Sequence, residues 1–565
     1  MFSSQTRGSP GVAVAALLFV GCGGARAEPP CASAAAPTSS TTAQAAASAS
    51  ASASAAPASS VPNVPASYAA LFADLVARIE RHHVFADAAK SGWPARKAQL
   101  EKEFSRVHTR EEALVALAHL ENALGDRHCS LSPPTDLRQG RLGLGLALFA
   151  ERVEGGAVRV RVSEVLDKDL ATGSTPTVAE GDEVVAVDGV PVATWLEAHP
   201  FESNSLNPTV VLFEQANAIV RARLPWSTIK KGDKRKLTLS RAGANHDVEL
   251  AFVHPGKWED AIDVDFDEAP AMSSIGCRND QHTLYSDFEL SAVGVNLCVY
   301  KPKKGDKAGK ADTRLVRFLS FAYGINQASD DGLRAAKADH DLLTRELAKA
   351  KAVVLDVHEN HGGNNPFVFL SWFAKSAWDH QQIHLRVSPE FSEDDVRSFV
   401  FGDSAMTTRY LELAKRGEGE VSFPFLCMAD GKPVTEGTCE GRGPRASELV
   451  SSAPVAIVTG PECTSSCDSI VADWSAFDLG PLVGQQPAHG FTTIRHSYAL
   501  VDPDGRDLGR FRIALSWEAY PRNNQPLEGR PVELDWEAPS TFETRNTWVD
   551  ASVREARRRA ESLGR

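Results

Sequence analysis

Two short apolar runs, each followed by a helix-forming segment, constrain the fold of this chain more than any other feature. AVVLDV (352–357) precedes a predicted helix after Pro366, and PVAIVTG (454–460) precedes the predicted helix SIVADWSAF. Short uninterrupted apolar runs are typical of strands that are buried on both faces. Because strands alternate with helices, we expect an α/β domain over residues 313–546 with a mostly parallel sheet.

The segments outside this domain follow other patterns. Residues 67–130 predict an N-terminal helical domain, and residues 131–255 hold short valine-rich segments that predict a small β-rich domain. Residues 256–312 are polar and are interpreted as an irregular insertion, whereas residues 547–565 predict a charged, solvated C-terminal helix. The evidence for the first helices is the apolar face Tyr68, Leu71, Phe72, Leu75 and Ile79 and the capping box of Thr109 and Glu112.

The N-terminus predicts export. The apolar run at residues 11–20 is too short to span a bilayer but suits a signal peptide, and LFVGC resembles a bacterial lipobox with Cys22 as the lipidated residue. We therefore expect a lipoprotein-type signal peptide over 1–22 and a disordered Ala/Ser/Pro tether over 23–66. The alternative is a soluble secretory signal that is cleaved after Ala27. Both interpretations place the protein in the periplasm or at the cell surface, the first with a lipid anchor.

The net charge of the chain argues against one class of binding partner. Its 565 residues carry a formal net charge of −13, which argues against nucleic-acid binding.

The histidines do not form a recognised zinc motif. His358 and His361 are three residues apart, whereas a zinc-binding H-E-x-x-H helix needs a spacing of four. We therefore expect neither a catalytic metal nor another cofactor. The oligomeric state has no signature in the sequence.

Among the nine cysteines, close pairs are disulfide candidates in an exported chain. By proximity the pairs would be Cys277–Cys298, Cys427–Cys439 and Cys463–Cys467. Two alternatives stay open near the last pair. Cys129 can pair with Cys463 or Cys467, or all three can be free buried thiols.

The stretch PECTSSCDS (461–469) lies between a predicted buried strand and a predicted helix. A serine on such a turn presents its hydroxyl at the edge of the sheet, next to the free N–H groups of the helix N-terminus. The alternative is that Ser465, Ser466 or Asp468 only caps the helix. Gly362 and Gly363 follow the other buried strand directly, where bare backbone can approach a ligand. Together these segments are what an acyl-transfer site needs.

At these residues the chain resembles the C-terminal processing (tail-specific) serine peptidases, which include the tricorn core protease. DVHENHGG (356–363) is similar to the D-x-R-x-N-x-G-G segment of the family, with His358 in place of the usual arginine. TSSCDS (464–469) is similar to the S-A-S-E helix of the family. The resemblance implies a crotonase-like or ClpP-like spiral core, Ser465 as nucleophile, and the N–H groups of Gly362 or Gly363 and of Ser466 as oxyanion donors.

The resemblance also implies a general base. The processing branch uses a lysine about 25 residues after the serine, but this chain has Gly490 there, after His489. The tricorn-like branch uses a histidine in an L-x-D-x-H segment, which LGDRHCSL (124–131) resembles. His128 is therefore the predicted base and His489 the second candidate.

An acidic residue orients the histidine in the tricorn-like branch. QPLEGRPVELD (525–535) resembles the segment that carries it, so Glu528 is the predicted residue and Glu518 the reserve. Asp126, although closer to His128 in sequence, is interpreted as fixing the local turn.

The β-rich domain resembles PDZ domains. AEGDEVVAVDGVPVATW (179–195) has their Gly-Asp and Asp-Gly signature, and Gly143, Leu144, Gly145 and Leu146 resemble the loop that holds a peptide C-terminus. The sequence thus predicts an exported serine endopeptidase that takes tails or unfolded segments of proteins. A catalytically silent binding protein of the same fold and a surface scaffold with a peptide-binding PDZ-like domain are the alternatives.

Overall fold

The computed structural model describes most of the chain after residue 63. The described residues are 64–83, 92–137, 140–171, 177–253, 277, 284–303, 312–323, 330–363, 366–375, 381–400, 404–424, 428–429, 432–433, 449–492, 494–520 and 525–564. The predicted signal peptide with Cys22, most of the tether, and the Cys427–Cys439 pair lie outside these residues. Within the described ranges, no helix combines the length and the apolar character that a membrane span requires.

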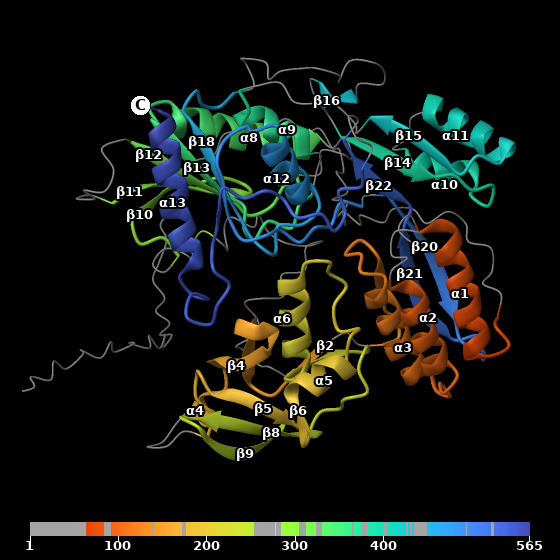
Figure 1. Cartoon of the computed structure of the whole chain (residues 1–565). Helices are drawn as coiled ribbons and strands as arrows, with labels where there is room; N and C mark the ends of the chain where they lie inside the picture. The colour runs from red at the N-terminus through yellow and green to blue at the C-terminus, as the bar shows by residue number, and fades with distance from the viewer. Residues whose placement is uncertain are drawn as a thin grey trace, which may run out of the picture. The chain divides into compact units, whose positions relative to one another are not determined.

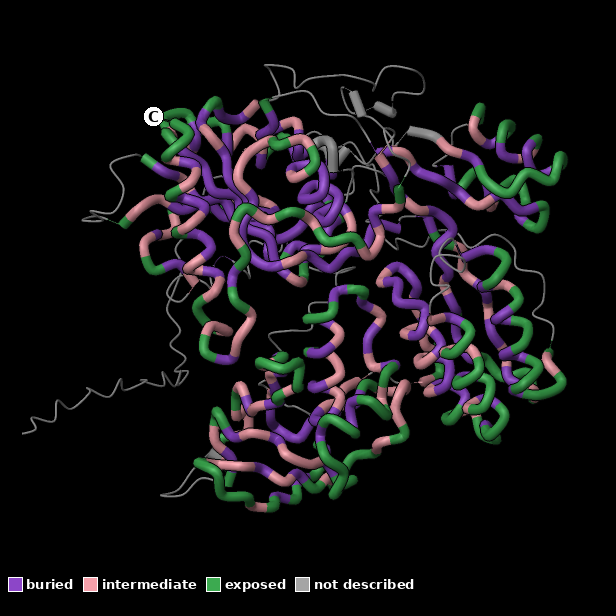
Figure 2. Tube along the Cα trace, viewed as in Figure 1, coloured by how far each residue is buried: buried purple, intermediate pink, exposed green. Residues whose placement is uncertain are grey.

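A seven-stranded sheet forms the centre of the α/β domain, in the order β10-β11-β12-β13-β18-β19-β23. From β12 to β23 neighbouring strands are parallel, whereas β10 and β11 are antiparallel. Every residue of β13 and β18 is buried, as the two apolar runs predict (Figure 2). The strands are β10 (Phe288–Val293), β11 (Leu297–Pro302), β12 (Thr313–Phe318), β13 (Ala352–Asp356), β18 (Val455–Thr459), β19 (Leu482–Gly484) and β23 (Trp536–Glu537).

Helices cover both faces of this sheet (Figure 1). On one face α8 (Asp330–Leu347), α9 (Pro366–Phe373) and α12 (Ser466–Ala476) pack on side chains such as Val353 and Ile457. On the other face α13 (Trp548–Leu563) packs on the alternate residues of the same strands, such as Val354 and Ala456. Because successive side chains of a strand point to opposite faces, β13 and β18 need an apolar partner on both sides.

Two expectations for this domain are wrong. Residues 288–302 are not irregular, because they form β10 and β11, whose side chains Leu297 and Val299 enter the core. The C-terminal helix is not solvated all round. Val549, Val553, Ala556 and Ala560 are buried against the sheet, and Arg557 is buried beside them in an ion pair with Glu561.

The N-terminal helices share a core with strands from the far end of the chain. They are α1 (Tyr68–His82), α2 (Trp93–Phe104) and α3 (Arg110–Ala123), and the predicted apolar face of α1 and the predicted capping box of α3 are both present. They pack on the three-stranded sheet of β1 (Ser130–Ser132), β21 (Asp507–Ala514) and β20 (Arg495–Val501). The pairing of β1 with β21 fixes the segment just before β1, which contains His128.

The β-rich unit has its own core around Leu148, Val160 and Leu239. Asp188 and Gly189 both have positive φ and form the predicted hairpin turn. Its main sheet contains β3 (Leu146–Arg152), β4 (Val158–Val165), β5 (Glu183–Val187), β6 (Val190–Pro191), β8 (Lys234–Arg241) and β9 (Ala244–Ala251). The remaining elements are the pair β2 (Gly140–Gly143) and β7 (Arg221–Leu224), the short turn η2 (Glu154–Gly156), and the helices α4 (Lys168–Ala171), α5 (Val192–Ala198) and α6 (Pro208–Ala218).

A smaller sheet extends the α/β domain, in the order β15-β14-β22. Two helices, α10 and α11, pack on it around the buried Tyr410. The elements are β14 (Gln382–Arg386), α10 (Glu393–Phe399), α11 (Ser404–Arg416), β15 (Glu420–Pro424) and β22 (Ser516–Ala519), with β16 (Met428–Ala429) and β17 (Lys432–Pro433) as a separate pair.

Candidate active site

Ser465 lies on a sharp turn between β18 and α12. Its backbone has φ 61° and ψ −125°, a region that residues other than glycine rarely adopt. It occupies the N-cap position of α12, but its side chain makes no capping hydrogen bond. The interpretation of Ser465 as a simple helix cap therefore fails. A strained backbone of this kind is often found where a side chain has to be held in a functional orientation.

A disulfide closes the turn around this serine. Cys463 and Cys467 are bonded, with their Cα atoms 5.2 Å apart, and Cys129 is a buried free thiol. The predicted Cys463–Cys467 bridge is therefore confirmed, and both alternatives that the sequence left open are wrong. Cys277 and Cys298 form the other predicted bridge among the described residues.

We expect removal of the bridge at Ser465 to lower activity more than its effect on stability would suggest. A chain-entropy estimate for so short a loop is about 2 kcal/mol. Because the bridge holds Ser465, the predicted nucleophile, the double variant Cys463→Ser/Cys467→Ser should also lose roughly 10- to 100-fold in kcat. The Cys277→Ser/Cys298→Ser variant is the control, since it should lower the unfolding midpoint and leave kcat unchanged. Equal kcat values for the two variants would contradict a role of the bridge in catalysis.

Gly362 lies directly against the serine turn because β13 and β18 are parallel neighbours. A Cβ atom on Gly362, which has φ +85°, would lie 2.5 Å from the Thr464 carbonyl oxygen and 2.9 Å from Ser465 Cβ. The Gly362 N–H already donates to Asn360 Oδ1 at 2.8 Å. Within the part of the chain that is described, the N–H groups of Gly363 and Ser466 have no hydrogen-bond acceptor. These two groups are therefore the better oxyanion donors of the three predicted.

The variant Gly362→Ala tests this contact. A methyl group has no space beside Thr464, so the turn has to shift, and we expect kcat to fall roughly 100-fold. Gly505→Ala is the matched control, because Gly505 also has a positive φ (+80°) but its Cβ would meet only Val64, at 3.9 Å. Both variants carry the backbone cost of about 1–2 kcal/mol. If both retain full kcat in a hydrolysis assay, the close approach of Gly362 is not needed for activity.

His358 lies between two carboxylates at the end of β13. Its Nδ1 lies 2.7 Å from Asp356 Oδ1, and its Nε2 lies 3.3 Å from Glu359 Oε1. Burial lowers the pKa of His358, but the carboxylates of Asp356 and Glu359 outweigh burial and raise the pKa to about 10. The imidazole is therefore a cation at neutral pH. It holds the end of β13, which leads to the two glycines, between two carboxylates.

His128 reaches the serine turn from the loop between α3 and β1. Its Cε1 would lie 3.7 Å from a Cβ atom on Gly490, and the Gly490 carbonyl accepts the Ser465 N–H at 3.1 Å. The two segments thus meet at Gly490, although no hydrogen bond joins Ser465 to the His128 ring in the described residues. Burial lowers the pKa of His128 to about 4, with smaller opposing and reinforcing effects from Asp126 and from Arg495 and Arg127. The imidazole is therefore neutral at pH 7, as a general base has to be.

His489, the second candidate base, belongs to the loop that supports Ser465. Its φ is 62°, and its ring Nε2 lies 3.3 Å from Gln486 Oε1. The buried Asp468 accepts the N–H groups of His489 and Gly490, both at 3.0 Å. Burial raises the pKa of Asp468 to about 8, although these two N–H groups act in the opposite direction. Asp468 thus holds the loop against the turn that carries Ser465.

The two predicted acids have different surroundings. Glu528 Oε2 accepts the N–H of Phe491 at 2.5 Å, one residue beyond Gly490. Glu518 lies on β22 and accepts the hydroxyl of Ser469 at 3.1 Å, beneath α12. Burial raises the pKa of both carboxyls well above the usual range. Glu528 is the nearer of the two to the loop that contacts His128.

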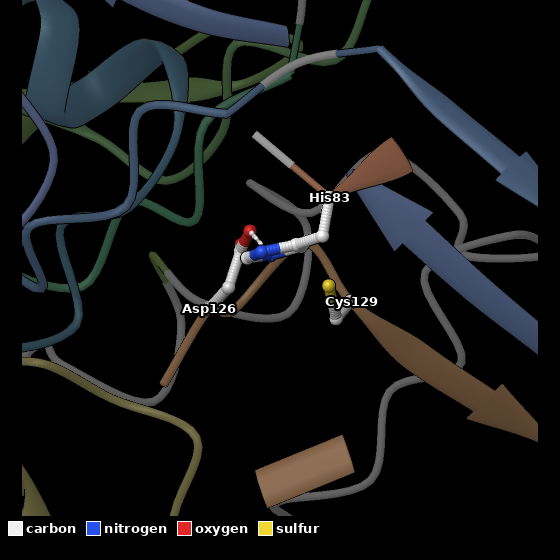
Figure 3. Close-up of side chains that lie close together, drawn as sticks. All are labelled: His83, Asp126 and Cys129. Atoms are coloured by element: carbon white, nitrogen blue, oxygen red, sulfur yellow. Dashed lines mark hydrogen bonds and ion pairs between the residues drawn. The ribbon is translucent and has the colours of Figure 1, made fainter. Parts of the chain in front are cut away.

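Asp126 joins three segments of the site, which the sequence did not predict. Its Oδ1 accepts the His128 backbone N–H and the Thr492 hydroxyl, both at 2.8 Å, and its Oδ2 lies 3.0 Å from His83 Nε2 (Figure 3). The first of these bonds is the local turn that was expected. His83 is buried, with 1% of its surface exposed. His83 is four residues beyond Ile79, so the helical face that was identified could have revealed it.

The loop that resembles a PDZ carboxylate site is occupied by its own chain. The N–H groups of Gly143 and Leu144 donate to the carbonyls of Val253 and Val220, each at 2.9 Å. Gly145 accepts two N–H groups, and Leu146 begins β3 and pairs with Val165. Along β3, the Asn217 side chain bonds both to the N–H and to the carbonyl of Leu148.

Comparison with solved structures identifies the fold. No family model matches the sequence, and no curated protein does. Mature CPAF matches with a TM-score of 0.63 and 14% identity, over 88% of this chain and 98% of that chain. Mature CPAF complexed with lactacystin matches with a TM-score of 0.58 and 14% identity over the same shares. The tricorn protease matches at 0.34 and 12% identity, over 87% of this chain and 37% of that chain, and adds nothing to the argument. The chain therefore has the fold of mature CPAF, and at the level of the fold this confirms its resemblance to the tail-specific and tricorn-like peptidases.

Proposed function

We propose that the chain is a serine endopeptidase that hydrolyses peptide bonds by a Ser-His-Glu mechanism. The observation that carries the proposal is Ser465, which is held at positive φ on a disulfide-closed turn with its hydroxyl not used for capping. A neutral buried imidazole reaches the same turn from another segment. Purely structural serines seldom need this arrangement.

In the proposed reaction the Ser465 hydroxyl attacks the carbonyl carbon of the scissile peptide bond. His128 accepts the hydroxyl proton and then donates it to the leaving amine as the C–N bond breaks. The N–H groups of Gly363 and Ser466 stabilise the oxyanion. Water then hydrolyses the acyl-enzyme by the same route in reverse order. Glu528 orients the imidazole, which its contact with Phe491 beside Gly490 supports.

The substrates we propose are polypeptides presented as tails or unfolded segments. The β-rich domain would act as the PDZ-like domain, and the parallel strands would form the crotonase-like spiral core. Because Asn217 occupies the edge of β3, a peptide would have to displace it in order to pair with that strand. The two disulfides support export, since such bonds persist in oxidising compartments. Lipid anchoring through Cys22 belongs to the same proposal.

The test is labelling with a serine-reactive fluorophosphonate, followed by mapping of the adduct by mass spectrometry. Residues 67–565 are incubated with the probe as wild type, His128→Ala and His489→Asn. Asparagine is chosen because it tolerates the positive φ of His489. An adduct on Ser465 that His128→Ala abolishes supports the proposal. Loss of the adduct only in His489→Asn would move the base to the other loop.

A catalytically silent binding protein is the second candidate. It is favoured by one observation, that within the described residues no hydrogen bond joins the Ser465 hydroxyl to His128. In that case wild type would bind unfolded polypeptides or apolar ligands in a calorimetric titration and form no adduct.

A further inference from the structure

Three side chains that the proposed mechanism does not consume lie together behind His128. His83 ends α1, and Asp126 and Cys129 lie on the loop before β1 (Figure 3). One ligand atom from each, an imidazole nitrogen, a carboxylate oxygen and a sulfur, all lie within 4.8 Å of one another. The three residues are 0–1% exposed. Figure 3 shows the His83 ring and the Cys129 sulfur on the same side of the Asp126 carboxylate.

We propose that His83, Asp126 and Cys129 form a binding site for Zn²⁺, and that occupancy of this site inhibits the protein. Zn²⁺ prefers nitrogen, sulfur and oxygen ligands at about 2.0–2.3 Å in a tetrahedral arrangement. Such bond lengths place ligand atoms roughly 3–4 Å apart, so the cluster has to contract by about 1 Å. His83 Nε2 and Asp126 Oδ2 already lie 3.0 Å apart.

The state of Cys129 supports a metal ligand over an inert core thiol. Cys277, Cys298, Cys463 and Cys467 are all in disulfides, whereas Cys129 is free. A structural buried cysteine usually has apolar neighbours. Cys129 belongs to the apolar core of the helical segment, but a carboxylate oxygen and an imidazole nitrogen also lie within 4.8 Å of its sulfur. When Zn²⁺ binds, the thiol releases its proton and the sulfur donates to the metal as a thiolate.

A candidate fourth ligand lies beside the cluster, outside the group whose ligand atoms are all within 4.8 Å of one another. The Nδ1 atom of His128 is buried without a hydrogen-bond partner in the described structure, and it lies 4.0 Å from Asp126 Oδ1. If Nδ1 binds the metal, the neutral ring carries its proton on Nε2. A protonated Nε2 cannot accept the proton of Ser465. Zinc at this site would therefore switch off the catalytic base without touching the serine.

Metal binding can be measured without any activity assay. Residues 67–565 are freed of metal with a chelator, dialysed and titrated with Co²⁺, whose thiolate-to-metal charge-transfer absorption reports a sulfur ligand. We expect one Co²⁺ per chain, displaced by Zn²⁺. Cys129→Ser should lose the charge-transfer band, and His83→Gln should weaken binding at least about tenfold. His119→Gln, on the neighbouring helix α3 and bonded to Glu103, is the matched control.

The test of inhibition by zinc depends on the proposed peptidase function, whereas the Co²⁺ titration does not. Zinc should block fluorophosphonate labelling of Ser465 in wild type, a chelator should restore it, and Cys129→Ser should be labelled with or without zinc. A missing charge-transfer band in wild type, or an unchanged one in Cys129→Ser, overturns the site. A normal band with no labelling under any condition would retain the metal site and reject the peptidase.

Discussion

Replacing Ser465 by alanine is expected to lower kcat for peptide hydrolysis by roughly 10⁴- to 10⁶-fold. The alcohol oxygen is the atom that forms the acyl-enzyme, and no neighbouring group can take its place. Ser466, the next hydroxyl, is buried and donates to the Gly363 carbonyl at 3.3 Å. The residual rate should reflect oxyanion stabilisation and binding alone. The measurement is turnover of an unfolded, fluorescently quenched protein substrate.

The fold should survive this substitution because the Ser465 side chain makes no capping bond. Alanine should therefore change the unfolding midpoint little, apart from the cost of its positive φ. Ser475→Ala is the matched control on the same helix, since its hydroxyl bonds only to the Glu533 carbonyl. Wild-type turnover in Ser465→Ala would reject Ser465 as the nucleophile. Loss of turnover in both variants would point to damage of α12.

Replacing His128 by alanine is expected to have the second largest effect, a loss of roughly 10⁴- to 10⁶-fold in kcat. Without a base, the serine hydroxyl stays protonated and is a weak nucleophile. His489→Asn should retain most of the activity, because the role of that residue is in the backbone that Asp468 holds. The comparison uses the same substrate in the presence of a chelator. Equal losses in both variants would show that the two loops act as one structural unit.

The pH dependence gives an independent check on His128. Its pKa is lowered to about 4 from the usual 6.5, chiefly by burial. Only the neutral ring can accept the serine proton, so the active fraction is close to one at every pH well above 4. We expect kcat/KM to stay level from about pH 8 to pH 5 and to fall about tenfold per unit below pH 4. An acid limb with its midpoint near 6.5 would show that a solvent-exposed histidine is the base.

The local elements of this fold could be read from the sequence. The runs at 352–357 and 454–460 are mostly apolar, with Asp356 and Thr459 as polar exceptions, and they do not alternate with polar residues. They therefore predict strands that are buried on both faces. The Thr109–Glu112 capping box and the Asp188-Gly189 turn are equally local, because each depends on residues within one turn of chain. By contrast, β10 (FELSAV) mixes apolar and polar residues, and β11 (LCVYKP) has only four apolar residues in succession. Both are recognised as strands of the central sheet from the pairing of β10 with β11 and of β11 with β12.

The pairing of the cysteines near Ser465 could not be decided from the sequence alone. Three pairings were open at Cys129, Cys463 and Cys467, because a disulfide depends on Cα distances that no spacing rule fixes. The turn between β18 and α12 brings the Cα atoms of Cys463 and Cys467 to 5.2 Å, whereas Cys129 lies on a different segment. Because this turn pairs Cys463 with Cys467, Cys129 keeps a free thiol beside Asp126.

The sequence by itself determined the two buried strands, the glycine pair after one of them and the serine turn after the other. These depend on side-chain type and short-range spacing. Only the tertiary structure decided what surrounds them. The pairing of β1 with β21 brings His128 to Gly490, and Asp126 then joins His83 and Thr492, which are about 400 residues apart. Such contacts form between segments that are far apart in the sequence and depend on how the whole chain packs. They therefore cannot be predicted from the residue pattern of one segment alone.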